Sequence, residues 1–146
     1  MVSSEEVAVL VYEQRRILDL MEALYNELAG LERSLLENRN ALEILNKYRS
    51  DADVAGHETL LPIGGGVYLP VSISRPDKII VGVGAGIYLE KDLDSAIELV
   101  NKSIDNLRKV IQDRTNLLTQ LRNRYEEITA RLAEIQFKMQ QRGRER

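Results

Sequence analysis

The 146-residue sequence has no cysteine, no tryptophan, one histidine and one phenylalanine. Without cysteine the chain can form neither disulfides nor thiolate metal sites, and one histidine leaves too few ligands for a zinc site. Aromatic residues make up only 5% of the chain, whereas a compact globular core relies on large aromatic side chains for much of its buried area. The composition therefore favours helices packed along narrow aliphatic seams.

Long apolar stretches are also missing. The sequence has no run of about 18 apolar residues and no signal-like segment at its start, so it predicts neither a membrane span nor export. With 44% hydrophobic and 29% charged residues, it does not have the composition of a disordered chain. These features indicate a folded cytoplasmic protein without a membrane partner.

Charge is distributed unevenly along the chain. Residues 1–49 carry 9 acidic and 6 basic residues, whereas residues 93–146 carry 8 acidic and 11 basic residues. Their opposite net charges, −3 and +3, favour side-by-side packing of these two segments. Acidic residues dilute the basic excess of the second segment, so no concentrated basic face for nucleic acid is expected.

Two long segments repeat apolar residues at alternating spacings of three and four. In the first segment, the positions of this repeat are Val7, Leu10, Gln14, Ile17, Met21, Leu24, Leu28, Leu31, Leu35, Asn38, Leu42 and Leu45. In the second segment, they are Leu93, Ile97, Val100, Ile104, Leu107, Ile111, Arg114, Leu118, Leu121, Tyr125, Ile128, Leu132, Ile135 and Met139. A 3.5-residue repeat of this length is typical of a coiled coil, whereas helices of a globular bundle would show wider stripes. Gln14, Asn38 and Arg114 interrupt the seams, either as register-setting or irregular positions or as functional polar groups.

Local signals indicate where these helices begin and end. Ser3 with Glu6, and Ser95 with Glu98, have the spacing of capping boxes, although Asp92 or Asp94 could cap the second helix instead. The polar stretch "RSDADVAGHE" should end the first helix. Two helices of near-equal length should pair antiparallel, with both chain termini at one end.

Four β-prone runs lie between the helices: "ETLLPI", "VYLPVSIS", "KIIVGV" and "GIYLEK". Gly64–Gly66, "RPD" and the glycines at 84 and 86 separate them with the spacing of two successive β-hairpins. Pro62 and Pro70 cannot donate backbone hydrogen bonds, so they should lie at sheet edges or strand ends. Because isolated hairpins are marginal in water, this insert should need partners from other chains.

The glycines of "VGVGAGIYLE" are spaced like those of a phosphate-binding loop. Ile87 stands where a dinucleotide fingerprint needs its third glycine, and no Gly-Lys-Ser/Thr tripeptide follows. A β-turn explains the spacing better. His57 lies in a polar loop beside Glu58, but no serine or cysteine nucleophile with a supporting base can be placed by spacing. Asp92 and Asp94 are explained as helix caps. The sequence predicts no enzyme and no cofactor.

A helix, two β-hairpins and a second helix of matching length resemble the alpha-type subunits of the prefoldin family. The resemblance covers essentially the whole chain and is most specific in "ETLLPIGGGVYLPVSI" and "KIIVGVGAGIYLEKDLDSAIE". The expected class is α+β, a long antiparallel coiled-coil helical hairpin with two β-hairpins inserted between the helices. Its expected parts are an N-terminal coiled-coil helix (1–49), a double β-hairpin oligomerisation region (50–92) and a C-terminal coiled-coil helix (93–146).

The resemblance also implies a function and partners. Prefoldin-type chaperones are hetero-hexamers of two alpha-type and four beta-type subunits, and the beta-type subunits carry one hairpin. They capture unfolded client proteins at the coiled-coil tips without ATP and deliver them to a group II cytosolic chaperonin. The alternative is a structural coiled-coil spacer or oligomerisation scaffold without chaperone activity.

Both ends of the chain carry surplus apolar residues. In "VAVLVY", Val7 and Leu10 fall on the seam, whereas Val9, Val11 and Tyr12 fall outside it and should face water. Near the other end, Ile135 and Met139 fall on the seam and Phe137 outside it. Apolar side chains exposed there mark either a binding surface or a fraying end, and Met139 could adapt to unlike partners. The predicted client-binding residues are Val7, Val9, Leu10, Val11, Ile135, Phe137 and Met139.

Overall fold

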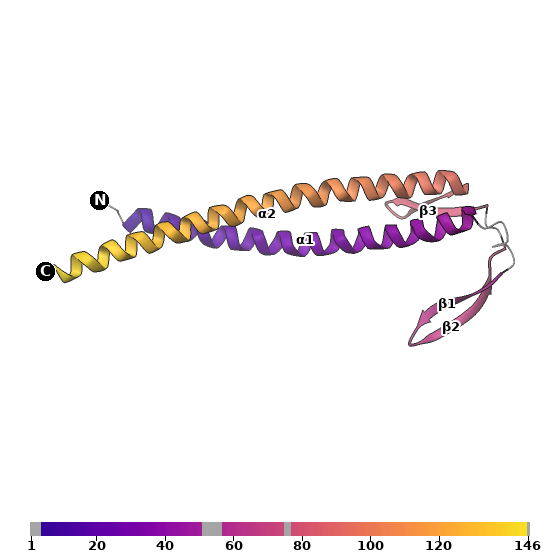
Figure 1. Ribbon diagram of the computed structural model, residues 1–146, viewed down its shortest axis with the longest axis horizontal. Helices are drawn as coiled ribbons and strands as arrows, with labels where there is room; N and C mark the ends of the chain where they lie inside the picture. The colour runs from indigo at the N-terminus through magenta and orange to yellow at the C-terminus, as the bar shows by residue number, and fades with distance from the viewer. Residues whose placement is uncertain (1–3, 51–56, 75–76, 146) are drawn as a thin grey trace. The chain divides into compact units, whose positions relative to one another are not determined.

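The computed structural model describes residues 4–50, 57–74 and 77–145 (Figure 1). The elements are α1 (Ser4–Ser50), β1 (Glu58–Gly64), β2 (Val67–Ser72), β3 (Ile79–Gly84), β4 (Ile87–Lys91) and α2 (Leu93–Arg144). This order confirms the predicted α+β class and both hairpins. The predicted cap at Ser3, and residues 51–56 of the polar stretch that should end the first helix, fall outside the described residues.

The chain divides into two compact units, which are described separately. One, the terminal unit, comprises Met1–Arg33 and Arg108–Arg146, and the other, the insert unit, comprises Ser34–Leu107. Each unit contains part of α1 and part of α2.

In the terminal unit, α1 and α2 run antiparallel. Ion pairs join Glu6 to Arg131, Glu13 to Arg124 and Glu27 to Arg114, so partner numbers fall along α2 as they rise along α1. The buried apolar side chains of this unit all lie at predicted seam positions; they are Ile17, Leu24, Leu118, Ile128 and Ile135. The 3.5-residue repeat therefore identified the buried face of both helices.

Polar residues on the seam pair across the helices in this unit. The Gln14 side-chain amide donates a hydrogen bond to the Thr129 hydroxyl at 2.9 Å. Arg114 Nε donates to Glu27 Oε1 at 2.8 Å. Both contacts fit a register-setting role, because a slipped pairing would separate their partners.

The strongest cross-helix ion pair joins Arg124 to Glu13. Arg124 donates from Nε to one carboxylate oxygen at 2.7 Å and from Nη2 to the other at 3.0 Å. This hydrogen bonding lowers the pKa of Glu13 below its ordinary value. Exposed ion pairs contribute only about 0 to 1 kcal/mol each, so the apolar seam provides most of the stability and the ion pairs favour one register.

In the insert unit, the β3–β4 hairpin packs against the helices. Leu45, Ala96 and Ile97 form a buried cluster. The partly buried side chains around it are Leu42, Ile79, Val81, Leu93 and Val100. Ala96 lies off the predicted seam but is fully buried, because this cluster includes contacts from β3 as well as from the paired helices.

Both hairpins turn in the same way. Gly64, Gly65 and Gly66 have φ angles of 100°, 61° and 74°, and the corresponding residues 84, 85 and 86 have 108°, 50° and 74°. The strand register shifts just before each turn, between Pro62 and Gly64 and between Gly82 and Gly84. The glycine-rich stretch therefore joins two antiparallel strands, which confirms the predicted turn. Because each sheet has two strands, Pro62 and Pro70 lie on edge strands as predicted.

Asp92 caps α2. The backbone N–H of Ser95 donates to Asp92 Oδ1 at 2.7 Å, and the helix begins at Leu93. This hydrogen bond lowers the pKa of Asp92. Of the alternatives left open by the sequence, the cap at Asp92 is confirmed and the capping box starting at Ser95 is wrong.

We expect Gly86→Val to destabilise the β3–β4 hairpin by about 1 to 2 kcal/mol, because a β-branched residue is strained at positive φ. A Cβ at this position would meet no other atom, so the loss reports backbone strain and not a clash. Ala85→Gly should be neutral or stabilising, since Ala85 itself has positive φ. Urea unfolding of the wild type, Gly86→Val and Ala85→Gly measures both effects. Equal stability of Gly86→Val and the wild type would contradict the assignment of Gly86 to a turn position that requires positive φ.

The lowered pKa of Glu13 predicts a pH dependence. The folded state binds the Glu13 proton less tightly than the unfolded chain does, so the stabilisation is present above the ordinary pKa of 4.5 and is lost as the pH falls through the lowered value. Glu13→Gln should therefore lower the melting temperature at neutral pH, and its difference from the wild type should narrow in acid. Glu126→Gln is the control, because Glu126 makes no ion pair with the described residues. An equal effect of the two substitutions at neutral pH would refute the role of Glu13.

Candidate functional site

Large apolar side chains are exposed at the start of α1. Val9, Val11 and Tyr12 are 63%, 49% and 67% exposed, whereas Val7 and Leu10 are half-buried on the side that faces α2. The exposure predicted from the heptad positions is confirmed. Tyr12 was not among the predicted client-binding residues, although its position outside the seam already signalled its exposure.

At the other end of the sequence, α2 continues past its last cross-helix ion pair. That pair joins Arg131 to Glu6, which lies two residues after the start of α1 at Ser4, whereas α2 runs on to Arg144 (Figure 1). We call residues 136–145 the α2 overhang. Phe137 and Met139 are each 61% exposed there.

The predicted client-binding residues thus fall into three groups. Val9, Val11, Phe137 and Met139 are exposed, Val7 and Leu10 are half-buried, and Ile135 is buried at 3% exposure. A client could reach Ile135 only if the helices separated. Met139 shares its seam with Ile135 but is exposed, since it lies beyond the paired part of α2.

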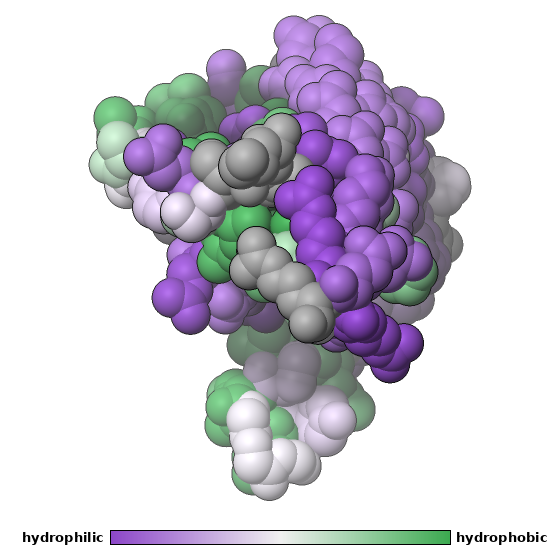
Figure 2. Space-filling model, turned by 90° about the vertical axis from the view of Figure 1, so that its left-hand side faces the viewer, coloured by the Kyte–Doolittle hydropathy of each residue, from purple (hydrophilic) through white to green (hydrophobic). Residues whose placement is uncertain are grey.

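The two hairpins expose a second apolar surface. Every side chain of β1 is exposed, and β2 is exposed except at Val71. Hydrophobic surface accordingly covers much of the β1–β2 hairpin at the bottom of Figure 2. The exposed large apolar residues of the hairpins are Leu60, Leu61, Ile63, Val67, Tyr68, Leu69, Ile80, Val83, Ile87, Tyr88 and Leu89. Clustered apolar exposure of this kind indicates an interaction site.

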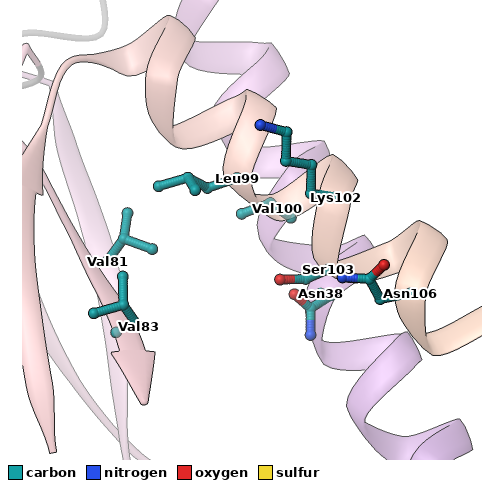
Figure 3. Close-up of a pocket in the computed structure, with 9 residues that line it drawn as sticks. Asn38, Val81, Val83, Leu99, Val100, Lys102, Ser103 and Asn106 are labelled. Carbon is teal, nitrogen blue, oxygen red and sulfur yellow. The ribbon is translucent and has the colours of Figure 1, made fainter.

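A groove of about 500 Å³ lies between β3 and the helices of the insert unit. Figure 3 shows Val81 and Val83 of β3 on one side of the groove and Leu99 and Val100 of α2 on the other. Its polar lining residues are Asn38, Lys102, Ser103 and Asn106.

Two of the polar lining residues, Asn38 and Lys102, are engaged by neighbours on their own helices. The Asn38 amide donates to the Ser34 carbonyl oxygen of its own helix at 2.8 Å, and Lys102 pairs with Glu98 at 3.2 Å. Asn38 therefore does not set the register across the helices as Gln14 does. The groove is lined by no carboxylate and no histidine, so its lining offers no acid–base pair.

The turn at Gly84–Gly86 is not a phosphate-binding loop of the dinucleotide or P-loop type, because it joins β3 to β4 and does not lead into a helix. Among the described residues, no group of three or more histidine, cysteine or acidic side chains is placed to hold a metal ion. Within the same residues, no helix combines the length and hydropathy needed to span a bilayer.

Comparisons with known proteins agree with this architecture. The prefoldin subunit family model matches residues 17–138. Prefoldin subunit alpha of Thermofilum pendens is 33% identical over 82% of this chain and 91% of its own length. The Archaeoglobus fulgidus prefoldin subunit alpha is 32% identical over 94% of this chain and 99% of its own length.

A solved structure shares the fold. A chain in the cryo-EM structure of filamentous PFD from Methanocaldococcus jannaschii superposes with a TM-score of 0.66 at 21% identity, covering 82% of this chain and 98% of that one. The family match spans most of the sequence, and relatives above 30% identity are covered almost end to end. The chain therefore belongs to the prefoldin family.

Proposed function

We propose that this chain is the alpha-type subunit of an ATP-independent co-chaperone that captures unfolded proteins at the ends of its paired helices and delivers them to a group II chaperonin in the cytoplasm. Its prefoldin family membership supports co-chaperone function over a purely structural spacer or scaffold. The observation that carries the capture site is the exposure of Val9, Val11, Tyr12, Phe137 and Met139. Aliphatic and aromatic side chains are costly to leave in water and gain free energy against an unfolded client.

Capture at such a site is weak per contact. Burying one of these side chains contributes about 1.5 to 3 kcal/mol at most, before the cost of ordering the client. Several helix ends held on one assembly raise the effective concentration of the second and third contacts. Capture then needs no nucleotide, and release needs only competition from the next binder.

We assign assembly to the oligomerisation region, residues 50–92. The two hairpins supply few strands and leave most of their apolar side chains exposed, a condition that other subunits would relieve by covering them. A hexamer with two alpha-type and four beta-type subunits would bring enough hairpins together to close them into barrels. We propose neither an enzymatic activity nor a cofactor for the chain.

Deleting residues 58–90 and bridging the helices should abolish assembly with a beta-type partner while leaving α1 and α2 paired. Mass measurement after mixing the subunits gives the stoichiometry, and circular dichroism reports the helices. A milder variant, Tyr68→Lys with Tyr88→Lys, changes exposed strand positions only and should shift assembly in the same direction. A hexamer that still forms with the deleted chain would place assembly elsewhere.

Removing residues 1–11 and 134–146 should leave the hexamer intact but reduce its ability to prevent aggregation of an unfolded protein, and Phe137→Ser should do part of the same. Leu36→Ser is the matched control, because Leu36 is 58% exposed on α1 but distant in sequence from its start. The ends of the alpha-type and beta-type subunits should be removed separately and together, since one set can mask loss of the other. Undiminished capture after removal of both sets would refute the site.

A further inference from the structure

We propose that the α2 overhang selects unfolded segments in which acidic residues lie beside large apolar ones. This inference rests on the proposed function and names the class of client segment that this end of the chain prefers. Its basis is the placement of Arg142 and Arg144 in the last turns of α2, one and two turns beyond the exposed apolar side chains of Met139 and Phe137 respectively.

Each apolar side chain of the overhang shares a helix face with an arginine. Met139 and Arg142 are three residues apart, so they are neighbours on the helix surface, and both line one open hollow together with Gly143 and Glu145. Phe137 and Arg144 are seven residues apart, which places them on one face about 10 Å apart along the axis.

Arg142 and Arg144 differ in their ion pairing from Arg124 and Arg131. Arg124 and Arg131 each hold two carboxylates, and Lys138 pairs with Glu134 at 2.7 Å. Arg142 and Arg144 form no ion pair with any described residue. Residues 136–145 contain three basic residues and one acidic residue, so the overhang carries a net charge of +2. Two of its basic groups, the guanidinium groups of Arg142 and Arg144, are exposed to solvent.

An unfolded segment with carboxylates near leucine or phenylalanine complements both features. Guanidinium groups bind carboxylates with directed hydrogen bonds, while Phe137 and Met139 bury the neighbouring apolar side chain. The Debye length is about 8 Å at physiological ionic strength, so the arginines act only on carboxylates that the apolar contact brings close. Charge then provides selectivity, and apolar burial provides most of the affinity.

The test uses the full-length chain and two fluorescent peptides with the same leucine and phenylalanine positions, one carrying four glutamates and the other four lysines. Anisotropy titration at low and high salt gives the affinity ratio of the peptides. We expect the wild type to prefer the acidic peptide about threefold to tenfold at low salt, the range that two exposed ion pairs supply, and to lose most of the preference at high salt. Arg142→Gln with Arg144→Gln should bring the ratio close to one, and lysine at both positions should retain it.

Arg108→Gln with Lys109→Gln is the matched control, because it removes the same charge at exposed positions of α2 that pair with no described residue. An equal preference for both peptides in the wild type, or an equal loss in the control variant, would overturn the inference. The arginine variants could instead lose helix content and lose the same amount of affinity for both peptides. That result would mean that these residues only stabilise the helix, and it would also overturn the inference. Phe137→Ser with Met139→Ser separates the two claims: if it leaves binding of both peptides unchanged, the proposed capture site itself fails.

Discussion

The narrow apolar seam between α1 and α2 is the constraint on which the rest of the molecule depends. Ile17, Leu24, Leu118 and Ile128 are buried because the 3.5-residue repeat keeps one stripe of each helix facing the other. A seam of this kind covers only that stripe. Apolar side chains outside this stripe must therefore pack against the inserted hairpins or against other chains. Those that do neither stay exposed to solvent.

Many of the exposed apolar groups lie in two regions that differ in local structure, although others, such as Leu36, lie along the helices. On the hairpins they occupy strands with unpaired edges, which suit permanent pairing with other subunits. At the start of α1 and in the α2 overhang they occupy helix positions outside the paired seam. We propose that this difference lets one chain combine an assembly surface on its strands with a capture site on its helix ends, where apolar burial provides most of the affinity. Cross-helix ion pairs such as Arg124 with Glu13 stabilise the register that fixes where the overhang begins.

Much of this could be predicted from the sequence, because the decisive signals are local. The seam positions follow from periodicity, the hairpins from glycines between β-prone runs, and the exposure of Val9 and Phe137 from heptad positions. The sequence could not predict the burial of Ala96, which depends on the docking of β3. Nor could it separate buried Ile135 from exposed Met139, because periodicity defines a seam but not where the partner helix begins. The cap at Asp92 also remained open, because several acidic and hydroxyl residues precede α2.

We propose that clients are held at the helix ends and not along the helices or on the hairpins. A photo-reactive amino acid placed singly at Tyr12, Phe137, Leu36 or Tyr88, all of them exposed, tests this directly in the assembled protein mixed with a urea-unfolded client. We expect cross-links to the client at Tyr12 and Phe137, at several times the yield at Leu36 and Tyr88. Equal yields at all four positions, or the highest yield at Leu36 or Tyr88, would contradict it.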